Sequence, residues 1–237
     1  MIIEKQNTIN LQRPAVVIDT FFEPKPKTPL PSKNGFALAI VGSPGSGKSS
    51  VMFSLIKSKD GYRKRFHKII SVIPQSSLAS LKSNPLKDIP EEQQFEDLTF
   101  ENLEDIVEMV EENREDGLVL TLLLLDDVSA ELQDPLILKA MMRLFLNRRH
   151  LKLSIIAIAH SLTGKGALPY TVRKNLSHLI LFKPSASLDI LNRDFLHMPK
   201  VKFKELTDYV YKGSHDHLMI ELNTNKLYKN FNALTLK

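Results

Sequence analysis

The feature that most constrains the fold of this chain is an eight-residue run, Gly42-Ser43-Pro44-Gly45-Ser46-Gly47-Lys48-Ser49, which is followed by Ser50. It matches the pattern G-x-x-x-x-G-K-[ST], in which glycines let the backbone curl until successive N–H groups point at phosphate oxygens. The pattern needs a buried strand before it and a helix after it. The apolar runs Phe36–Val41 and Ser49–Ile56 supply both. We therefore expect residues 42–50 to bind the phosphates of a nucleotide, the alternative being an ordinary glycine-rich turn.

Further apolar runs alternate with helical patterns along the chain. Short continuous runs, typical of buried strands, occur at Phe36–Val41, Lys68–Ile73, Leu118–Leu125, Leu153–Ala159 and His178–Phe182. Helical spacing occurs in Ser49–Ile56, Asn102–Glu115, Pro135–Asn147, Tyr170–Asn175 and Phe203–Tyr211. This alternation predicts an α/β fold of the phosphate-loop NTPase type, with a mostly parallel central sheet and helices on both faces. Leu218–Leu222 and Lys226–Phe231 predict a small C-terminal β-hairpin extension.

Polar side chains follow two of the predicted strands. Lys48 at the end of the glycine run can reach the β- and γ-phosphates of ATP, and the Ser49 hydroxyl can coordinate Mg²⁺. Asp126 and Asp127 follow a buried strand directly, at the end of a parallel sheet where ligands sit. We expect Asp126 to hold Mg²⁺ and Asp127 to orient or deprotonate the attacking water, the alternative being a turn or helix-cap pair.

The strand Leu153–Ala159 is followed by His160. Because we expect this strand to lie beside the one that ends at Asp126, His160 is a candidate to touch the γ-phosphate and sense hydrolysis. A capped surface residue is the other interpretation.

Charge is unevenly distributed. Residues 135–188 contain no acid, against nine Lys and Arg and three His, whereas residues 88–116 contain 13 acids and one base. The basic stretch indicates a surface that faces a polyanion, or else a set of solvated faces. The acidic block is the outer face of one helix or a partner surface in a ring.

Composition excludes several other classes of protein. The chain has no cysteine, which excludes disulfide scaffolds and thiolate metal sites. Leu118–Leu125, its longest clean apolar stretch, is far shorter than the roughly 20 residues that span a bilayer. The N-terminus lacks the apolar block of a secretion signal. We therefore expect neither a membrane-spanning segment nor secretion.

The order of motifs resembles a known family. The phosphate loop and the Asp126-Asp127 strand are followed by Asn147-Arg148-Arg149-His150, Ser154-Ile155-Ile156, Leu168-Pro169, Arg173-Lys174-Asn175 and Leu181-Phe182-Lys183. From Gly35 to Pro184 this resembles the poxvirus-type genome-packaging ATPases of large DNA viruses and virophages, within the FtsK–HerA superfamily.

The resemblance implies an ATP-hydrolysing motor that drives double-stranded DNA into a preformed capsid. It also implies a homo-oligomeric ring of five or six subunits, a capsid-protein partner, and a location in the virus factory of the host cytoplasm or in the virion. Arg173 matches a family arginine that a neighbouring subunit would supply to the γ-phosphate, with Arg148 and Arg149 as rivals and a DNA-facing surface arginine as the alternative for all three. His160 stands where relatives usually carry Gln. Lys165 is a candidate DNA contact or part of a flexible loop.

These patterns divide the chain into an N-terminal proline-rich arm (1–34), an ATPase core (35–184) and a C-terminal extension packed on the core (185–237). Two other functions share the phosphate loop: a small-molecule kinase, and a nucleotide-gated assembly switch. DNA-stimulated turnover distinguishes the motor from both.

Overall fold

The computed structural model of the chain describes residues 2–5, 26–32, 35–79, 86–115, 119–164, 166–183 and 188–236. Within these residues ten strands form one sheet in the order β1-β10-β9-β8-β7-β2-β6-β5-β3-β4. The six strands from β7 to β4 in that order run parallel. They are β2 (Ala37–Val41), β3 (Lys68–Val72), β4 (Gln94–Phe95), β5 (Thr121–Leu125), β6 (Leu153–Ala159) and β7 (His178–Phe182).

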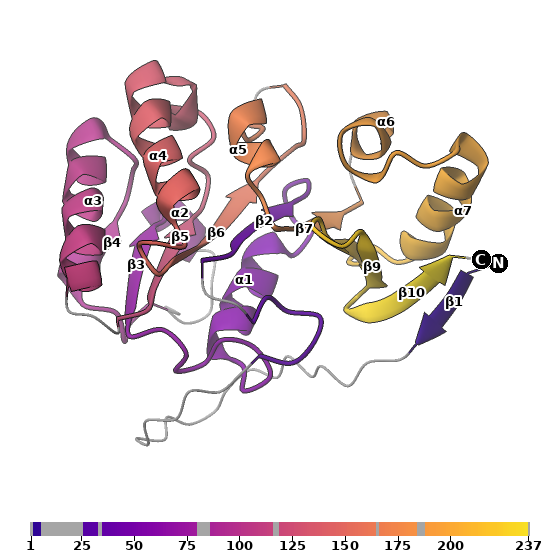
Figure 1. Cartoon of the computed structure of the whole chain (residues 1–237), viewed down its shortest axis with the longest axis horizontal. Helices are drawn as coiled ribbons and strands as arrows, with labels where there is room; N and C mark the ends of the chain where they lie inside the picture. Colours follow the sequence, from indigo (N-terminus) through magenta and orange to yellow (C-terminus); the bar gives the residue numbers. More distant parts are fainter. Residues whose placement is uncertain are drawn as a thin grey trace.

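Helices cover both faces of the parallel part of this sheet, so its central strands are buried. One face packs against α3 (Phe100–Glu115), α4 (Pro135–Asn147), α5 (Tyr170–Lys174), α6 (Asp189–Leu191) and α7 (Lys200–Val210), and the other packs against α1 (Lys48–Lys57) (Figure 1). Every residue of β2, β5, β6 and β7 is buried. Burial on both sides explains why these strands read as continuous rather than alternating apolar runs.

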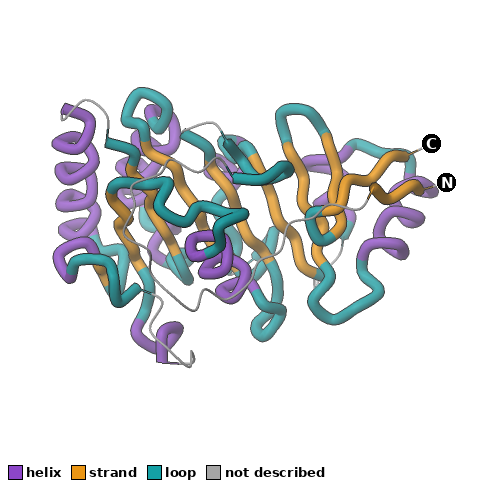
Figure 2. Tube along the Cα trace, turned by 90° about the horizontal axis from the view of Figure 1, so that it is seen from below, coloured by secondary structure: helices purple, strands orange, loops and turns teal. Residues whose placement is uncertain are grey.

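The sheet continues beyond β7 as an antiparallel extension. β8 (His217–Glu221) pairs with β7, and β9 (Lys226–Lys229), β10 (Asn232–Leu236) and β1 (Ile2–Lys5) follow in turn. The two strands nearest the chain ends therefore lie side by side at one edge of the molecule (Figure 2). The predicted hairpin is present as β8 and β9, and it is the middle of a longer antiparallel sheet.

Several predicted boundaries differ from the observed ones. β5 begins at Thr121 rather than Leu118, and α3 begins at Phe100, where the Thr99 hydroxyl accepts a hydrogen bond from the Asn102 N–H at 3.1 Å. The segment Pro74–Asp97, in which we predict no helix or strand, contains the short elements α2 (Gln75–Ala79), η1 (Glu91–Gln93) and β4. These elements have two to five residues each, too few to produce a recognisable periodicity.

The described part of the proline-rich segment packs on the loop that follows α1. Leu30 is buried, the Tyr62 hydroxyl donates to the Pro31 carbonyl at 3.1 Å, and Lys27 forms an ion pair with Asp60 at 3.0 Å. The apolar run Ala15–Ile18 and Lys165 lie outside the described residues. No helix within the described ranges combines the length and apolar character that crossing a membrane requires.

Candidate active site

The phosphate loop joins β2 to α1 at the carboxyl end of the parallel strands. Gly45 and Gly47 have φ values of 76° and 104°, a region of backbone space that favours glycine. The Gly42 N–H donates to the Ala159 carbonyl at 3.2 Å, which fastens the start of the loop to the end of β6. The loop therefore curls above the middle of the sheet, with Pro44 and Gly45 exposed at its tip and Ser50 exposed on the first turn of α1.

Lys48 lies inside this loop. Its side chain is buried, and Nζ donates to the Ser43 carbonyl at 2.9 Å, spanning the loop. Burial lowers the pKa of the Lys48 ammonium, and the charges of Asp126 and Asp127 oppose that shift. The lysine is thus held where a phosphate would bind, and among the described residues the carboxylates of Asp126 and Asp127 offset its charge.

Asp126 lies at the end of β5 and is only 4% exposed. The Ser49 hydroxyl approaches its Oδ2 at 3.5 Å. Burial raises the pKa of Asp126, and the charge of Asp127 raises it further, whereas Lys48, His160 and the Ser49 hydrogen bond act in the opposite direction. A buried carboxylate that is costly to ionise, beside a hydroxyl, fits a Mg²⁺ ion, which takes few protein oxygens and fills its shell with water and phosphate.

Asp127 and His160 meet at the ends of neighbouring strands. His160 Nε2 lies 3.0 Å from Asp127 Oδ1, and β5 pairs directly with β6, as the sequence indicates. Asp127 adopts a left-handed backbone conformation with φ of 57°, and half of its side chain is exposed. Because an ionised carboxylate only accepts hydrogen bonds, His160 donates from Nε2. The carboxylate is therefore oriented but still open to water.

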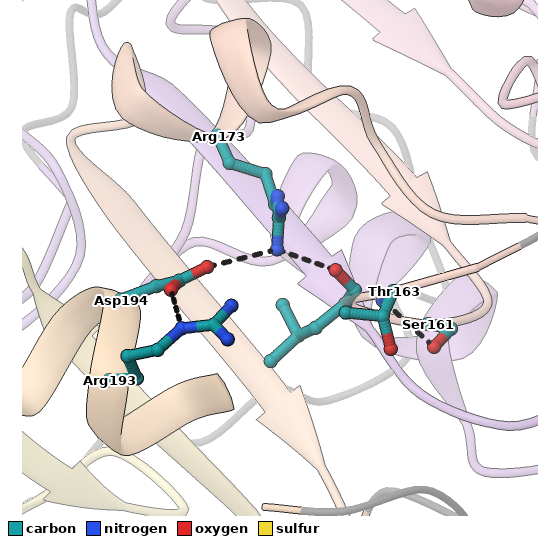
Figure 3. A network of polar contacts seen from close by, with 6 residues as sticks. Ser161, Thr163, Arg173, Arg193 and Asp194 are labelled. Atoms are coloured by element: carbon teal, nitrogen blue, oxygen red, sulfur yellow. Dashed lines mark hydrogen bonds and ion pairs between the residues drawn. The ribbon is translucent and has the colours of Figure 1, made fainter. Parts of the chain in front are cut away.

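Arg173 is held within its own chain. One guanidinium nitrogen donates to the Leu162 carbonyl at 2.6 Å and lies 3.4 Å from Asp194 Oδ2, while Arg193 pairs with the other oxygen of Asp194 (Figure 3). The Arg173 side chain is 12% exposed. The network links α5 to the loop after β6 and to the segment η3 (Asn192–Leu196), so Arg173 does not reach the phosphate loop of its own chain.

The rival arginines lie at the opposite end of the parallel strands. Arg148 donates to the Gly35 and Phe145 carbonyls, just before β2 begins and at the end of α4. Arg149 is exposed beside Gly35. Either arginine would need to come from a neighbouring subunit to act at a phosphate.

Sequence reasoning missed two residues that contact the phosphate loop. Phe182, at the end of β7, closes one side of it: a Cβ on Gly42 would lie 2.7 Å from Phe182 Cβ. His215 reaches it from the C-terminal extension, with Nδ1 3.0 Å from the Ser46 carbonyl oxygen. The apolar strand ending in Phe182 could have revealed the first residue, whereas no local pattern marks His215.

The site has the groups that ATP and Mg²⁺ require. Glycine N–H groups curl around a buried lysine, and the Ser46 hydroxyl is buried with no hydrogen-bond partner among the described residues. The start of α1 points its positive end into the loop. The sheet order also places β6, the His160 strand, between the phosphate-loop strand and the Asp126 strand. Fold and site together define a phosphate-loop ATPase.

Comparison with known proteins identifies the family. The model of the family described as Poxvirus A32 protein matches residues 29–215. The chain therefore belongs to the Poxvirus A32 protein family, and it is an ATPase. Comparison with curated protein sequences gives no significant match.

Solved structures share the fold at low sequence identity. The genome packaging NTPase B204 from Sulfolobus turreted icosahedral virus 2, in complex with AMPPCP, has a TM-score of 0.56 and 17% identity, covering 82% of this chain and 96% of that one. EssC (ATPases 2 and 3) from Geobacillus thermodenitrificans has a TM-score of 0.59 and 16% identity, covering 84% and 38%. The pCW3 conjugation coupling protein TcpA, with ATPγS, has a TM-score of 0.56 and 14% identity, covering 84% and 60%.

Proposed function

We propose that this ATPase is the motor that drives double-stranded viral DNA into a preformed capsid. The observation that carries the proposal is the match of the Poxvirus A32 family over residues 29–215. The shared fold with a protein named as a genome packaging NTPase and the acid-free stretch 135–188 support it. The site of action is then the virus factory of the host cytoplasm, or the virion.

In this proposal the phosphate loop binds ATP. The backbone N–H groups of residues 42–50 and the Lys48 ammonium hold the β- and γ-phosphates, since preorganised donors in a buried site stabilise developing phosphate charge at little reorganisation cost. Ser49 and Asp126 would hold a Mg²⁺ ion, whose positive charge would offset the negative charge of the phosphates. Lys48 acts by position as well as charge, because its hydrogen bond to the Ser43 carbonyl spans the phosphate loop.

Asp127 is the residue that orients and deprotonates the attacking water. Its carboxylate is half exposed, so water can reach it, and its second oxygen is not taken by His160. His160 fixes the direction of the carboxylate. His160 also lies at the end of β6, between the phosphate loop and Asp127, where it can contact the γ-phosphate. When hydrolysis removes that phosphate, a shift of His160 can move the loop after β6, whose Leu162 carbonyl binds Arg173.

The motor works as a ring of five or six identical subunits around DNA, with a capsid protein as its docking partner. Lysines and arginines that face the pore contact DNA phosphates, so binding weakens as salt rises. An arginine supplied by one subunit to the ATP of the next, Arg173 or one of its rivals, couples hydrolysis around the ring.

The test is steady-state ATP hydrolysis with and without double-stranded DNA at low and moderate salt, with Lys48→Ala as the blank. We expect DNA to stimulate turnover several-fold at low salt and less at moderate salt. Lys48→Ala should lose tight nucleotide binding as well as turnover. Turnover that DNA does not change at either salt would overturn the motor, and stimulation by a small phosphate acceptor instead would indicate a kinase.

A further inference from the structure

A loop of the C-terminal extension lies on the phosphate loop. His215, between α7 and β8, places Nδ1 3.0 Å from the Ser46 carbonyl oxygen, although the two residues are 169 positions apart in the chain. The loop arrives there because β8 runs antiparallel to β7, with His217 paired to Phe182. That register puts the start of β8 at the end of the sheet where the nucleotide site lies.

The His215 loop is fixed by its own network of contacts. The Asp216 carboxylate accepts hydrogen bonds from the Gly213 N–H at 2.7 Å and from Asn230 Nδ2 at 2.6 Å, and Lys229 Nζ lies 3.5 Å from it. Asn230 Oδ1 in turn accepts from the His217 N–H at 2.9 Å. Asn230, in the turn between β9 and β10, thus binds both the Asp216 carboxylate and the His217 N–H, and this fixes the loop.

Aromatic packing supports the loop from below. The His217 ring is buried, and its centroid lies 5.1 Å from the centroid of the Phe182 ring and 4.9 Å from that of the Phe231 ring. Phe182 also borders the phosphate loop, because a Cβ on Gly47 would lie 3.7 Å both from its ring and from His215 Nδ1. The packed rings of Phe182, His217 and Phe231 therefore support the loop that carries His215, and Phe182 also contacts the phosphate loop.

The hydrogen bond sets the orientation of one peptide group. Ser46 offers a carbonyl oxygen, which only accepts, so His215 donates from Nδ1. The peptide unit is planar and trans, so the Gly47 N–H points opposite to the Ser46 carbonyl. Holding that carbonyl outward aims the Gly47 N–H into the loop, where successive amides meet phosphate oxygens.

We propose that His215 is a positioning residue of the nucleotide site, which fixes the Ser46–Gly47 peptide so that the phosphate loop is preorganised for ATP. The C-terminal extension is then part of the ATP site of its own subunit. This role depends on ATP binding at the phosphate loop and is independent of DNA translocation.

The direct test compares His215→Ala, His215→Asn and Ser214→Ala in ATP and ADP binding titrations and in steady-state hydrolysis. The side-chain amide nitrogen of Asn is as many bonds from Cα as Nδ1 of His, so Asn can donate the same hydrogen bond. Ser214 is the exposed neighbour in the same loop and serves as the control. We expect His215→Ala to weaken ATP and ADP binding by roughly three- to tenfold, the range of one hydrogen bond. KM should rise by the same factor with kcat within about twofold. His215→Asn should recover most of the affinity, and Ser214→Ala should match the wild type.

Asp216→Ala provides a second, independent variant. It keeps His215 but removes the carboxylate that holds the loop, so we expect the same loss of ATP and ADP affinity as in His215→Ala. The ratio of DNA-stimulated to basal turnover should stay as in the wild type. Wild-type affinity in His215→Ala, or equal losses in His215→Ala and His215→Asn, would overturn the role. Failure of the packaging proposal has a different signature, because the DNA stimulation would then be missing from the wild type itself.

Discussion

At the scale of single residues, the site combines groups that are unfavourable to bury together. Asp126 shows this most clearly, because burial and the adjacent Asp127 raise its pKa. An acid whose pKa is higher in the folded chain than in the unfolded chain costs stability once the pH lies above both values. Such a cost fits the proposed role of Asp126, in which a cation and a nucleotide bind beside the carboxylate.

We therefore expect Asp126→Asn to stabilise the ligand-free protein while removing its response to Mg²⁺. The neutral amide avoids the cost of ionising a buried acid, so the free energy of unfolding without ligand should rise by about 1 kcal/mol. Thermal unfolding with and without Mg²⁺ and ATP measures both effects. A variant that is less stable than the wild type without ligand, yet still gains stability from Mg²⁺ and ATP, would show that Asp126 is a structural acid.

Asp127→Asn should separate ATP binding from ATP hydrolysis. The amide oxygen can still accept from His160 Nε2, so the geometry of the pair is kept, but the amide cannot take a proton from water. We expect ATP affinity close to that of the wild type and turnover lower by about 10²- to 10⁴-fold, the usual range for loss of a general base. Nucleotide titration and single-turnover hydrolysis test this, and wild-type turnover would place the base elsewhere.

At the scale of elements, two buried histidines make the join between β7 and β8 sensitive to acid. Burial lowers the pKa of His178 to about 4 and of His217 to about 4, while Glu221 opposes the shift at His178 and the His215 backbone and Asp216 oppose it at His217. In the unfolded chain both titrate near 6.5. The unfolded state therefore binds more protons between these values, and stability falls as the pH is lowered from about 6.5 to about 4.

The expected loss is on the order of 2–4 kcal/mol for each histidine across that range. Urea unfolding at pH 7 and pH 5 should show a smaller difference in His178→Gln/His217→Gln than in the wild type. His150→Gln, at an exposed position, is the control and should keep the wild-type difference. An equal pH difference in the double variant and the wild type would contradict the assignment.

The spacing of apolar residues predicted the strands of the parallel core. In the antiparallel half it predicted β8 and β9 but missed β10 and β1. Strands such as Leu153–Ala159 are buried on both faces, so their apolar runs identify them without tertiary information. β10 is only partly buried and β1 pairs with it across more than 200 residues, a contact that no local spacing encodes. The same reason hid His215, whose position depends on the register of β8 against β7. The positions of Asp126, Asp127 and His160 at the end of the sheet were predictable because these residues lie within two positions of the end of a buried strand.

At the scale of the whole molecule, one continuous sheet joins the strands that carry the candidate site to the C-terminal extension. The Arg173 network makes a second connection between these parts, since Asp194 belongs to η3 and Leu162 follows β6. The contact leaves two roles open to experiment for Arg173. Either Arg173 contacts the γ-phosphate bound by a neighbouring subunit, or it is a structural residue that connects α5 to η3.

Mixed rings distinguish these roles. Arg173→Ala and Asp127→Asn should each be nearly inactive alone, because every site lacks one group. If Arg173 acts on the neighbouring subunit, an equal co-assembled mixture forms about a quarter of its sites from an intact Asp127 and a neighbour's intact Arg173. Turnover should then recover to a clear fraction of the wild type. Asp194→Asn, which breaks this connection but keeps Arg173, should retain activity in this case. Inactive mixtures at every ratio, together with an inactive Asp194→Asn, would make Arg173 a structural residue, and the same mixing scheme with Arg148→Ala or Arg149→Ala would then identify the arginine that acts between subunits.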